Sequence, residues 1–439
     1  MDALFNLDQR LEGDRLKLCT VARGCACLML CVALVLPTPA ATALALQQPS
    51  VSAGVEGKAD DTNASALNQE IDRLRVEGFN LLYDLEYTTA RERFLKMTKL
   101  APDHPAGFLY LANNLWLETL AASRRLNTSV YTSGSFYEQD KDEDRSDPKR
   151  DRNFGNLIGQ AISLAKARLQ KNTDDVEALY YYASALGLRA SYQVTVKRSF
   201  RKALGDANES IKLHKKVVKL DPDYVDSYLS IGLYEYVIDT LPMLWRTLAR
   251  LAGLSGSRKR GIEQLEMVVA KGKYTQDDAR VVLIGLYGKE RKPERALEMI
   301  SYLANKYQHN YLFGVERAGM LYTMSRTEEG AQAYGELLKD ARIAQAATDL
   351  IYYQWGQSSL AKGDFVTAIQ KFNEVKKWSK SDPDLVSLAH LYSALALDAT
   401  GKRTEAVSEY EAVLKRENVY DSHKQASQYI KAPYVPAKS

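Results

Sequence analysis

Apolar residues recur at intervals of three and four positions from about residue 67 to about residue 426. This spacing is typical of amphipathic α-helices, and short turns containing Asp, Pro or Gly interrupt it. No stretch alternates apolar and polar residues with the period of two that indicates a β-strand. We therefore predict an all-α fold over residues 67–426.

The predicted helices form pairs that share one internal spacing. A small residue in the first helix is followed twelve positions later by a second small residue, then by an aromatic and an apolar residue. Only a small side chain lets two helix backbones approach closely, and the aromatic ring fills the space against the next pair. Three sets show this spacing most clearly: Gly78, Ala90, Phe94 and Met97; Gly356, Ala368, Phe372 and Val375; Ala394, Ala406, Tyr410 and Val413.

This spacing resembles that of the tetratricopeptide repeat (TPR) family over roughly residues 70–418. The resemblance implies a right-handed superhelical solenoid of helix hairpins, interrupted in this chain by long insertions. It also implies that the first helix of each hairpin lines a concave groove that takes up peptides or helices of partner proteins.

One stretch, over about residues 205–335, resembles a narrower branch of the family. Leu241-Pro242 is followed by an apolar helix, then by Gly253-Leu254-Ser255-Gly256, and finally by Arg258 and Gly261. This order resembles the signature of the tetratricopeptide repeat protein 39 branch, which includes an inclusion-body-clearance protein of fungi linked to lipid droplets. Members of that branch are intracellular, whereas the beginning of this chain has the pattern of a secretory signal.

The family resemblance also suggests which residues face the groove. Tyrosine is abundant, with 27 Tyr against 10 Phe and 4 Trp, and its flat amphipathic ring suits both hairpin interfaces and a binding wall. Each groove candidate either faces the groove or is buried between hairpins. The candidates are Tyr110, Asn113 and Trp116; Tyr180, Tyr181 and Ser184; and Tyr353, Gln354, Gln357 and Tyr392.

Two insertions break the repeat spacing. Residues 121–152 carry a run of mixed charge from residue 140 to residue 152, which predicts a solvated surface loop or an ordered flap over the groove. The second insertion follows Gly232 and contains a short amphipathic helix that either packs on the core or lies on a membrane surface. Its apolar positions are Leu241, Leu244, Trp245, Leu248 and Leu251.

The ends of the chain differ from the helical part. Residues 1–45 combine positive charges, an apolar run and possible A-x-A cleavage sites, which predicts a signal peptide or an uncleaved anchor helix. Residues 46–66 are small and polar and predict a disordered linker, and residues 427–439 predict an extended tail. We therefore expect a periplasmic or secreted protein, or one held at the membrane by its N-terminal helix. All four cysteines lie in the first segment: Cys19, Cys25, Cys27 and Cys31.

The chemistry of the remaining residues favours binding over catalysis. Lys and Arg number 59 against 55 Asp and Glu, so the chain lacks the basic excess of a nucleic-acid-binding protein. The five histidines are isolated in sequence, and no catalytic or metal-binding motif is present. We predict a non-catalytic protein-binding scaffold of the cell envelope that needs no metal or cofactor. The alternative is a membrane- or lipid-associated adaptor that uses the helix around Trp245.

Overall fold

The computed structural model describes residues 58–123, 126, 147–251 and 254–436, apart from the side chains of residues 58–65, 200–201, 244–245 and 248. Every regular element in those ranges is a helix, as predicted. The chain divides into an N-terminal unit that ends at Glu290 and a C-terminal unit that begins at Arg291.

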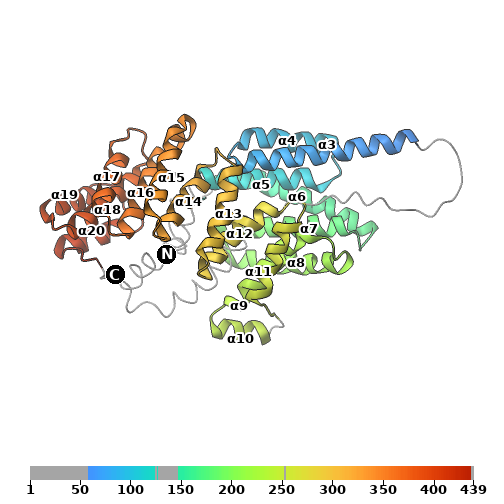
Figure 1. The fold of residues 1–439 in the computed structure, drawn as a ribbon. Coiled ribbons are helices and arrows are strands. Elements are labelled where there is room, and N and C mark those ends of the chain that lie inside the picture. The colour runs from blue at the N-terminus through green and yellow to red at the C-terminus, as the bar shows by residue number, and fades with distance from the viewer. Residues whose placement is uncertain (1–57, 124–125, 127–146, 252–253, 437–439) are drawn as a thin grey trace. The chain divides into compact units, whose positions relative to one another are not determined.

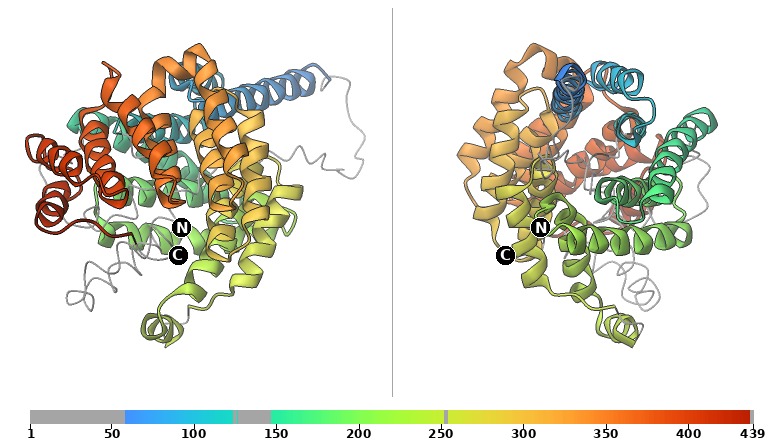
Figure 2. Two further views of the ribbon diagram at one scale, coloured as in Figure 1. Left: turned by 60° about the vertical axis from the view of Figure 1, so that its left-hand side comes forward. Right: turned by 90° about the vertical axis from the view of Figure 1, so that its right-hand side faces the viewer.

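The helices of each unit pack as successive hairpins (Figure 1, Figure 2). In the N-terminal unit the helices are α3 (Lys58–Tyr83), α4 (Tyr87–Leu100), α5 (Pro105–Ala122), α6 (Pro148–Lys171), α7 (Val176–Thr195), α8 (Phe200–Leu220), the short 3-10 helix η4 (Val225–Ser227), α9 (Tyr228–Thr240), α10 (Met243–Leu251), α11 (Arg258–Lys271) and α12 (Gln276–Lys289). In the C-terminal unit they are α13 (Pro293–Lys306), α14 (Tyr311–Thr323), α15 (Thr327–Lys339), α16 (Ala341–Ala361), α17 (Phe365–Lys377), α18 (Pro383–Ala399), α19 (Arg403–Leu414) and α20 (Ser422–Lys431).

Small residues lie where the two helices of a hairpin cross, as the sequence spacing predicts. A methyl group added at Gly78 in α3 would lie 2.4 Å from a ring carbon of Phe94 in α4. The same addition at Gly356 in α16 would lie 2.7 Å from the ring of Phe372 in α17. No larger side chain fits at these crossings, which is the reason that the sequence spacing gave for the small residues. The fold is therefore an array of TPR-type hairpins.

The turns inside the hairpins share a backbone conformation. Gly363 and Gly401 have φ angles of +76° and +77°, and each follows the small residue of its first helix by seven positions. Leu85 and Ser325 adopt φ angles of 65° and 62° in turns of the same type. The turn geometry is therefore kept even where the residue is not glycine, although a side chain makes this conformation less favourable.

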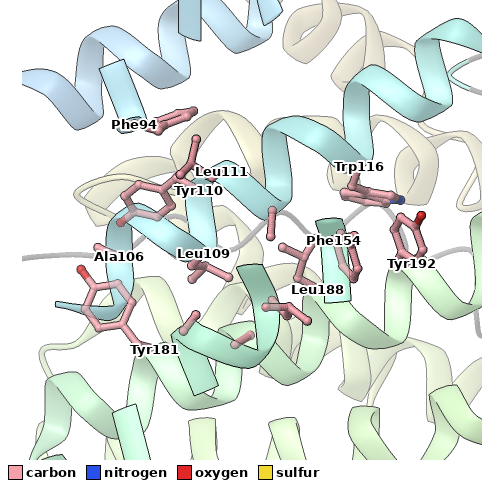
Figure 3. Close-up of a cluster of buried hydrophobic side chains, with 14 of the residues drawn as sticks. Phe94, Ala106, Leu109, Tyr110, Leu111, Trp116, Phe154, Tyr181, Leu188 and Tyr192 are labelled. Carbon is pink, nitrogen blue, oxygen red and sulfur yellow. The ribbon is translucent and has the colours of Figure 1, made fainter. Parts of the chain in front are cut away.

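Aromatic side chains fill the space between hairpins in the N-terminal unit (Figure 3). The ring of Phe154 in α6 stacks on Tyr192 in α7 with the ring centroids 3.8 Å apart. Beside them, Nε1 of Trp116 donates a hydrogen bond of 2.8 Å to the hydroxyl of Thr195. Part of the abundant tyrosine is thus used in the interior, where seven of the bulkiest fully buried residues are Tyr110, Tyr180, Tyr181, Tyr236, Tyr287, Tyr334 and Tyr410.

Three predicted boundaries need correction. Helix α3 begins at Lys58, so the last part of the expected linker 46–66 is helical. Helix α6 begins at Pro148, so the end of the charged run 140–152 is helical as well. The expected tail 427–439 begins within α20, and beyond that helix the backbone N–H of Tyr434 donates a 2.9 Å hydrogen bond to Asp398. Residues 1–57 and 127–146, which carry the predicted signal and most of the first insertion, lie outside the described residues.

Candidate functional site

The six groove candidates of the N-terminal unit are all buried. None of them exposes more than 1% of its surface, so no partner reaches them in this structure. Figure 3 shows Tyr110 and Tyr181 with their hydroxyl groups directed toward the same space. Burial raises the pKa of Tyr181, which keeps that hydroxyl neutral at physiological pH. The sequence left two roles open for these residues, facing the groove or being buried between hairpins. The structure shows burial for all six: Tyr110, Asn113, Trp116, Tyr180, Tyr181 and Ser184.

A buried carboxylate fixes the turn that precedes α12. Asp226 exposes 3% of its surface and accepts hydrogen bonds from the backbone N–H groups of Lys273, Tyr274 and Thr275 at 3.2, 3.1 and 2.9 Å. It also accepts a 2.6 Å hydrogen bond from the hydroxyl of Thr275. These four bonds satisfy a carboxylate that would otherwise be costly to bury.

The same turn contacts the first helix of the unit. The hydroxyl of Tyr274 donates a 3.1 Å hydrogen bond to Asp72 in α3, and its ring centroid lies 4.2 Å from the guanidinium carbon of Arg75. Arg75 is 1% exposed and pairs with Asp72. A second contact joins the hydroxyl of Tyr83 to Asp278. Helix α3 and the start of α12 are therefore neighbours although about half of the chain separates them.

His214 has a packing role. Its ring lies 5.4 Å from that of Tyr180, and its Nδ1 is 3.2 Å from the hydroxyl oxygen of Ser227. Burial lowers the pKa of His214 to about 3, so the ring is neutral at physiological pH. It occupies the interior position that an aromatic residue takes in other hairpins.

The C-terminal unit brings its groove candidates together on α16 and α18. The side-chain amide of Gln357 donates a 2.7 Å hydrogen bond to the hydroxyl of Tyr353, whose ring centroid lies 6.1 Å from that of Tyr392. Tyr353 is buried, whereas Gln354, Gln357 and Tyr392 are half-buried. We call these four residues the glutamine–tyrosine patch. Unlike the candidates in the N-terminal unit, most of them keep surface that a partner can contact.

Sequence reasoning missed a polar cavity of about 380 Å³ between α17, α18 and α19. Lys376 and Glu409 line the cavity, and Nζ of Lys376 lies 2.9 Å from one oxygen of Glu409. The other oxygen of Glu409 lies 2.6 Å from Nδ1 of His390 in α18. Burial opposes the charge on Glu409, but the hydrogen bonds with His390 and Lys376 lower its pKa below the usual range. No sequence motif joins these residues, because each comes from a different helix.

The second insertion does contain the predicted short helix, α10. Figures 1 and 2 show it extending beyond the hairpin of α9 and α11. Met243 and Leu251, at its two ends, are 79% and 81% exposed. The prediction that Leu241 belongs to this helix is wrong, because Leu241 is the C-cap of α9 and precedes Pro242; its side chain is half-buried. The side chains of Leu244, Trp245 and Leu248 lie outside the described part of the chain, so the predicted apolar face is untested there.

The described residues contain neither a membrane-spanning helix nor a metal-binding cluster. Among them, no helix is long and apolar enough to cross a membrane. In the same ranges, no group of three or more His, Cys, Asp or Glu side chains is placed to hold a metal ion.

Comparisons with known proteins give similarity in fold at low identity. No protein-family model matches the chain, and no curated protein matches it. A tetratricopeptide repeat protein from Parabacteroides merdae is 13% identical, covering 75% of this chain and 99% of that one, with a TM-score of 0.30. Yeast Tom70 is 13% identical, covering 85% and 94%, with a TM-score of 0.37. Human IFIT1, in a dimer with m7Gppp-AAAA, is 12% identical, covering 83% and 84%, with a TM-score of 0.37.

These TM-scores are all below 0.5, so the assignment to the TPR fold rests on the hairpin geometry described above. The narrower resemblance of residues 205–335 to the tetratricopeptide repeat protein 39 branch stays a prediction.

Proposed function

We propose that the protein is a non-catalytic scaffold that binds a peptide or helix of a partner protein at the glutamine–tyrosine patch. The observation that carries the proposal is the cluster formed by Tyr353, Gln357 and Tyr392, with Gln354 beside it on α16. Tyrosine rings offer flat apolar surface with a polar edge. Glutamine amides both donate and accept, so they can pair with a peptide backbone.

The proposal makes Gln354 the side chain to change first. Gln354 is half-buried, and its side chain forms no hydrogen bond within the part of the chain that the structure describes. Gln354→Arg should therefore fold normally while placing a bulky charge in the patch. Peptides selected on the purified protein from a phage-displayed library should bind the variant at least about tenfold more weakly, a loss of roughly 1.4 kcal/mol. Circular dichroism should show unchanged helicity.

The matched control is Gln370→Arg, which makes the same change at an exposed position of α17. We expect this variant to bind the selected peptides as the unmodified protein does. Equal affinity in all three proteins would refute the patch as the binding surface.

We further propose that the chain works in the cell envelope, either exported or held by an N-terminal anchor. The support is the pattern of residues 1–45, whose positive charges precede an apolar run and small residues. N-terminal sequencing of the protein purified from its native cells tests the cleaved form, which should begin close to Ala45. An intact N-terminus on a protein found inside the cytoplasm would refute export.

A second candidate function is an adaptor at a lipid surface through α10. The exposed ends of this helix favour it, because Met243 and Leu251 present apolar side chains to solvent and the basic residue Arg250 precedes Leu251. The protein should float with anionic liposomes, and Leu251→Glu should abolish flotation. The control Leu220→Glu changes an exposed leucine at the end of α8. Absence of flotation in the unmodified protein would eliminate this function.

A further inference from the structure

We propose that the partner peptide carries a lysine or arginine side chain that pairs with Glu316 in α14, beside the glutamine–tyrosine patch. The inference rests on the proposed function, because it states which kind of peptide the patch takes. The patch supplies contact area and hydrogen bonds, and Glu316 supplies the charge that selects a basic side chain. Glu316 is thus a specificity-determining residue.

The last three hairpins of the C-terminal unit repeat in a fixed register. The small residues of their first helices lie 38 positions apart in the chain, at Ala318, Gly356 and Ala394. The same shift of 38 positions leads from Glu316 to Gln354 and from Gln354 to Tyr392, and all three side chains are half-buried. Equivalent positions of stacked hairpins form a row along one face, and α14, α16 and α18 are neighbours in that order. Glu316 therefore continues the row that contains two residues of the patch.

Two hydroxyl groups link the surroundings of Glu316 and Gln354. The hydroxyl oxygen of Tyr334 in α15 lies 3.0 Å from that of Ser358, which is one turn after Gln354 in α16. A methyl group added at Gly319, one turn after Glu316, would lie 3.4 Å from the Tyr334 hydroxyl and 3.9 Å from that of Ser358. Burial raises the pKa of Tyr334, and the charge of Glu316 adds to the rise. Residues one turn apart share a helix face, so Glu316 and Gln354 flank the same hydroxyl pair.

The carboxylate of Glu316 has no partner of its own. Within the part of the chain that the structure describes, it forms neither a hydrogen bond nor an ion pair. The next residue, Arg317, donates a 3.2 Å hydrogen bond to the side chain of Asn305 instead. Burial raises the pKa of Glu316, since it opposes the charged form. A cation supplied by a bound peptide would offset part of that cost and stabilise the complex.

The neighbouring first helices carry little charge. Helix α16 has no Asp, Glu, Lys or Arg from Leu350 to Ala361, and α18 has none from Leu385 to Leu397. Glu316 therefore sets the sign of the charge at one end of the row. A basic side chain complements it, and an acidic one would be repelled.

The row also predicts where the basic residue lies in the peptide. Packed helices are about 10 Å apart, and an extended chain advances about 3.3 Å per residue. A peptide that crosses from α14 to α16 in extended form therefore has its basic residue about three positions from the residue that contacts Gln354.

Peptides selected on the purified full chain from the phage-displayed library test the inference. They should share a lysine or arginine. Changing that residue to glutamine in the peptide, or Glu316→Gln in the protein, should weaken binding about tenfold. The two changes together should cost no more than either alone, because both remove the same ion pair. Selected peptides without a shared basic residue, or losses that add in the double change, would overturn the inference.

The stability of Glu316→Gln separates a binding role from a structural one. Its free energy of unfolding in urea should equal or exceed that of the unmodified protein, because the substitution removes a carboxylate without a partner. If the variant loses helicity, the peptide arm decides. An unchanged affinity after the basic residue of the peptide is replaced overturns the inference, and a tenfold loss supports it.

The matched control is Glu336→Gln in α15. It removes the same charge at an exposed position, where Glu336 pairs with Lys339 at 2.7 Å. This variant should bind the selected peptides as the unmodified protein does. Equal losses in the two glutamate variants would overturn the inference, because they would reflect the overall charge of the unit.

Gln354→Arg distinguishes a failure of this inference from a failure of the proposed function. If Gln354→Arg loses binding and Glu316→Gln does not, the patch binds the peptide and the role of Glu316 is refuted. If neither variant loses binding, the patch is not the binding surface, and both proposals are refuted.

Discussion

Replacing Gly261 by alanine should lower the free energy of unfolding of the N-terminal unit by about 3 kcal/mol, because the new methyl group meets backbone on a neighbouring helix. It would lie 2.5 Å from the carbonyl oxygen of Gly232 and 2.8 Å from the backbone nitrogen of Tyr236. Backbone atoms in a helix cannot turn aside as a flexible side chain can. Helices α9 and α11 would have to separate, which weakens the packing along both of them.

The control for this prediction is Gly285→Ala in α12. A methyl group there would have no other atom within 4 Å, apart from its own helix backbone. Alanine favours the helix over glycine by about 1 kcal/mol, so this variant should be more stable than the unmodified protein. Urea unfolding followed by circular dichroism measures both variants. If the free energy of unfolding changed in the same direction in both variants, the result would contradict the close crossing of α9 and α11.

Replacing Asp226 by alanine should lower the free energy of unfolding by about 4 kcal/mol, since it removes a buried charged acceptor and leaves several donors without a partner. Three of those donors are the backbone N–H groups of Lys273, Tyr274 and Thr275. A side-chain rearrangement cannot supply these backbone N–H groups with a new acceptor. The turn that precedes α12 should therefore lose its order.

Asp221→Ala provides the comparison for Asp226→Ala. Asp221 accepts one exposed hydrogen bond, of 3.0 Å, from the backbone N–H of Asp223. Its loss should cost about 1 kcal/mol or less. Urea unfolding again gives both values, and similar costs for the two variants would show that the Asp226 network does not hold the turn.

The repeat architecture could be predicted because its determinants are local. Gly356 and Ala368 are small for a steric reason, and their separation follows from the length of one hairpin. The left-handed turns at Gly363 and Gly401 follow the same logic, since glycine adopts that conformation readily. Leu85 and Ser325 carry no such signal, and their turn conformation is imposed by the two helices that they connect.

The contact between α3 and the turn that precedes α12 could not be predicted from the local sequence pattern. It depends on Tyr274 meeting Asp72, residues that lie 202 positions apart in the chain. The family resemblance assigned Tyr180 and Tyr181 to the groove, yet both are buried, because a resemblance in hairpin spacing does not report which side chains the neighbouring helices cover. The cavity around Lys376 and Glu409 was missed for the same reason, since α17 and α19 meet only in the folded chain.

The most direct test of partner binding at the glutamine–tyrosine patch is photo-crosslinking from two defined positions in the native cell. A photoreactive residue placed at Gln354 in α16 should form a discrete adduct with a partner protein. The same residue placed at Gln370, on the exposed face of α17, should form none. An adduct from position 370 with none from position 354 would contradict the account.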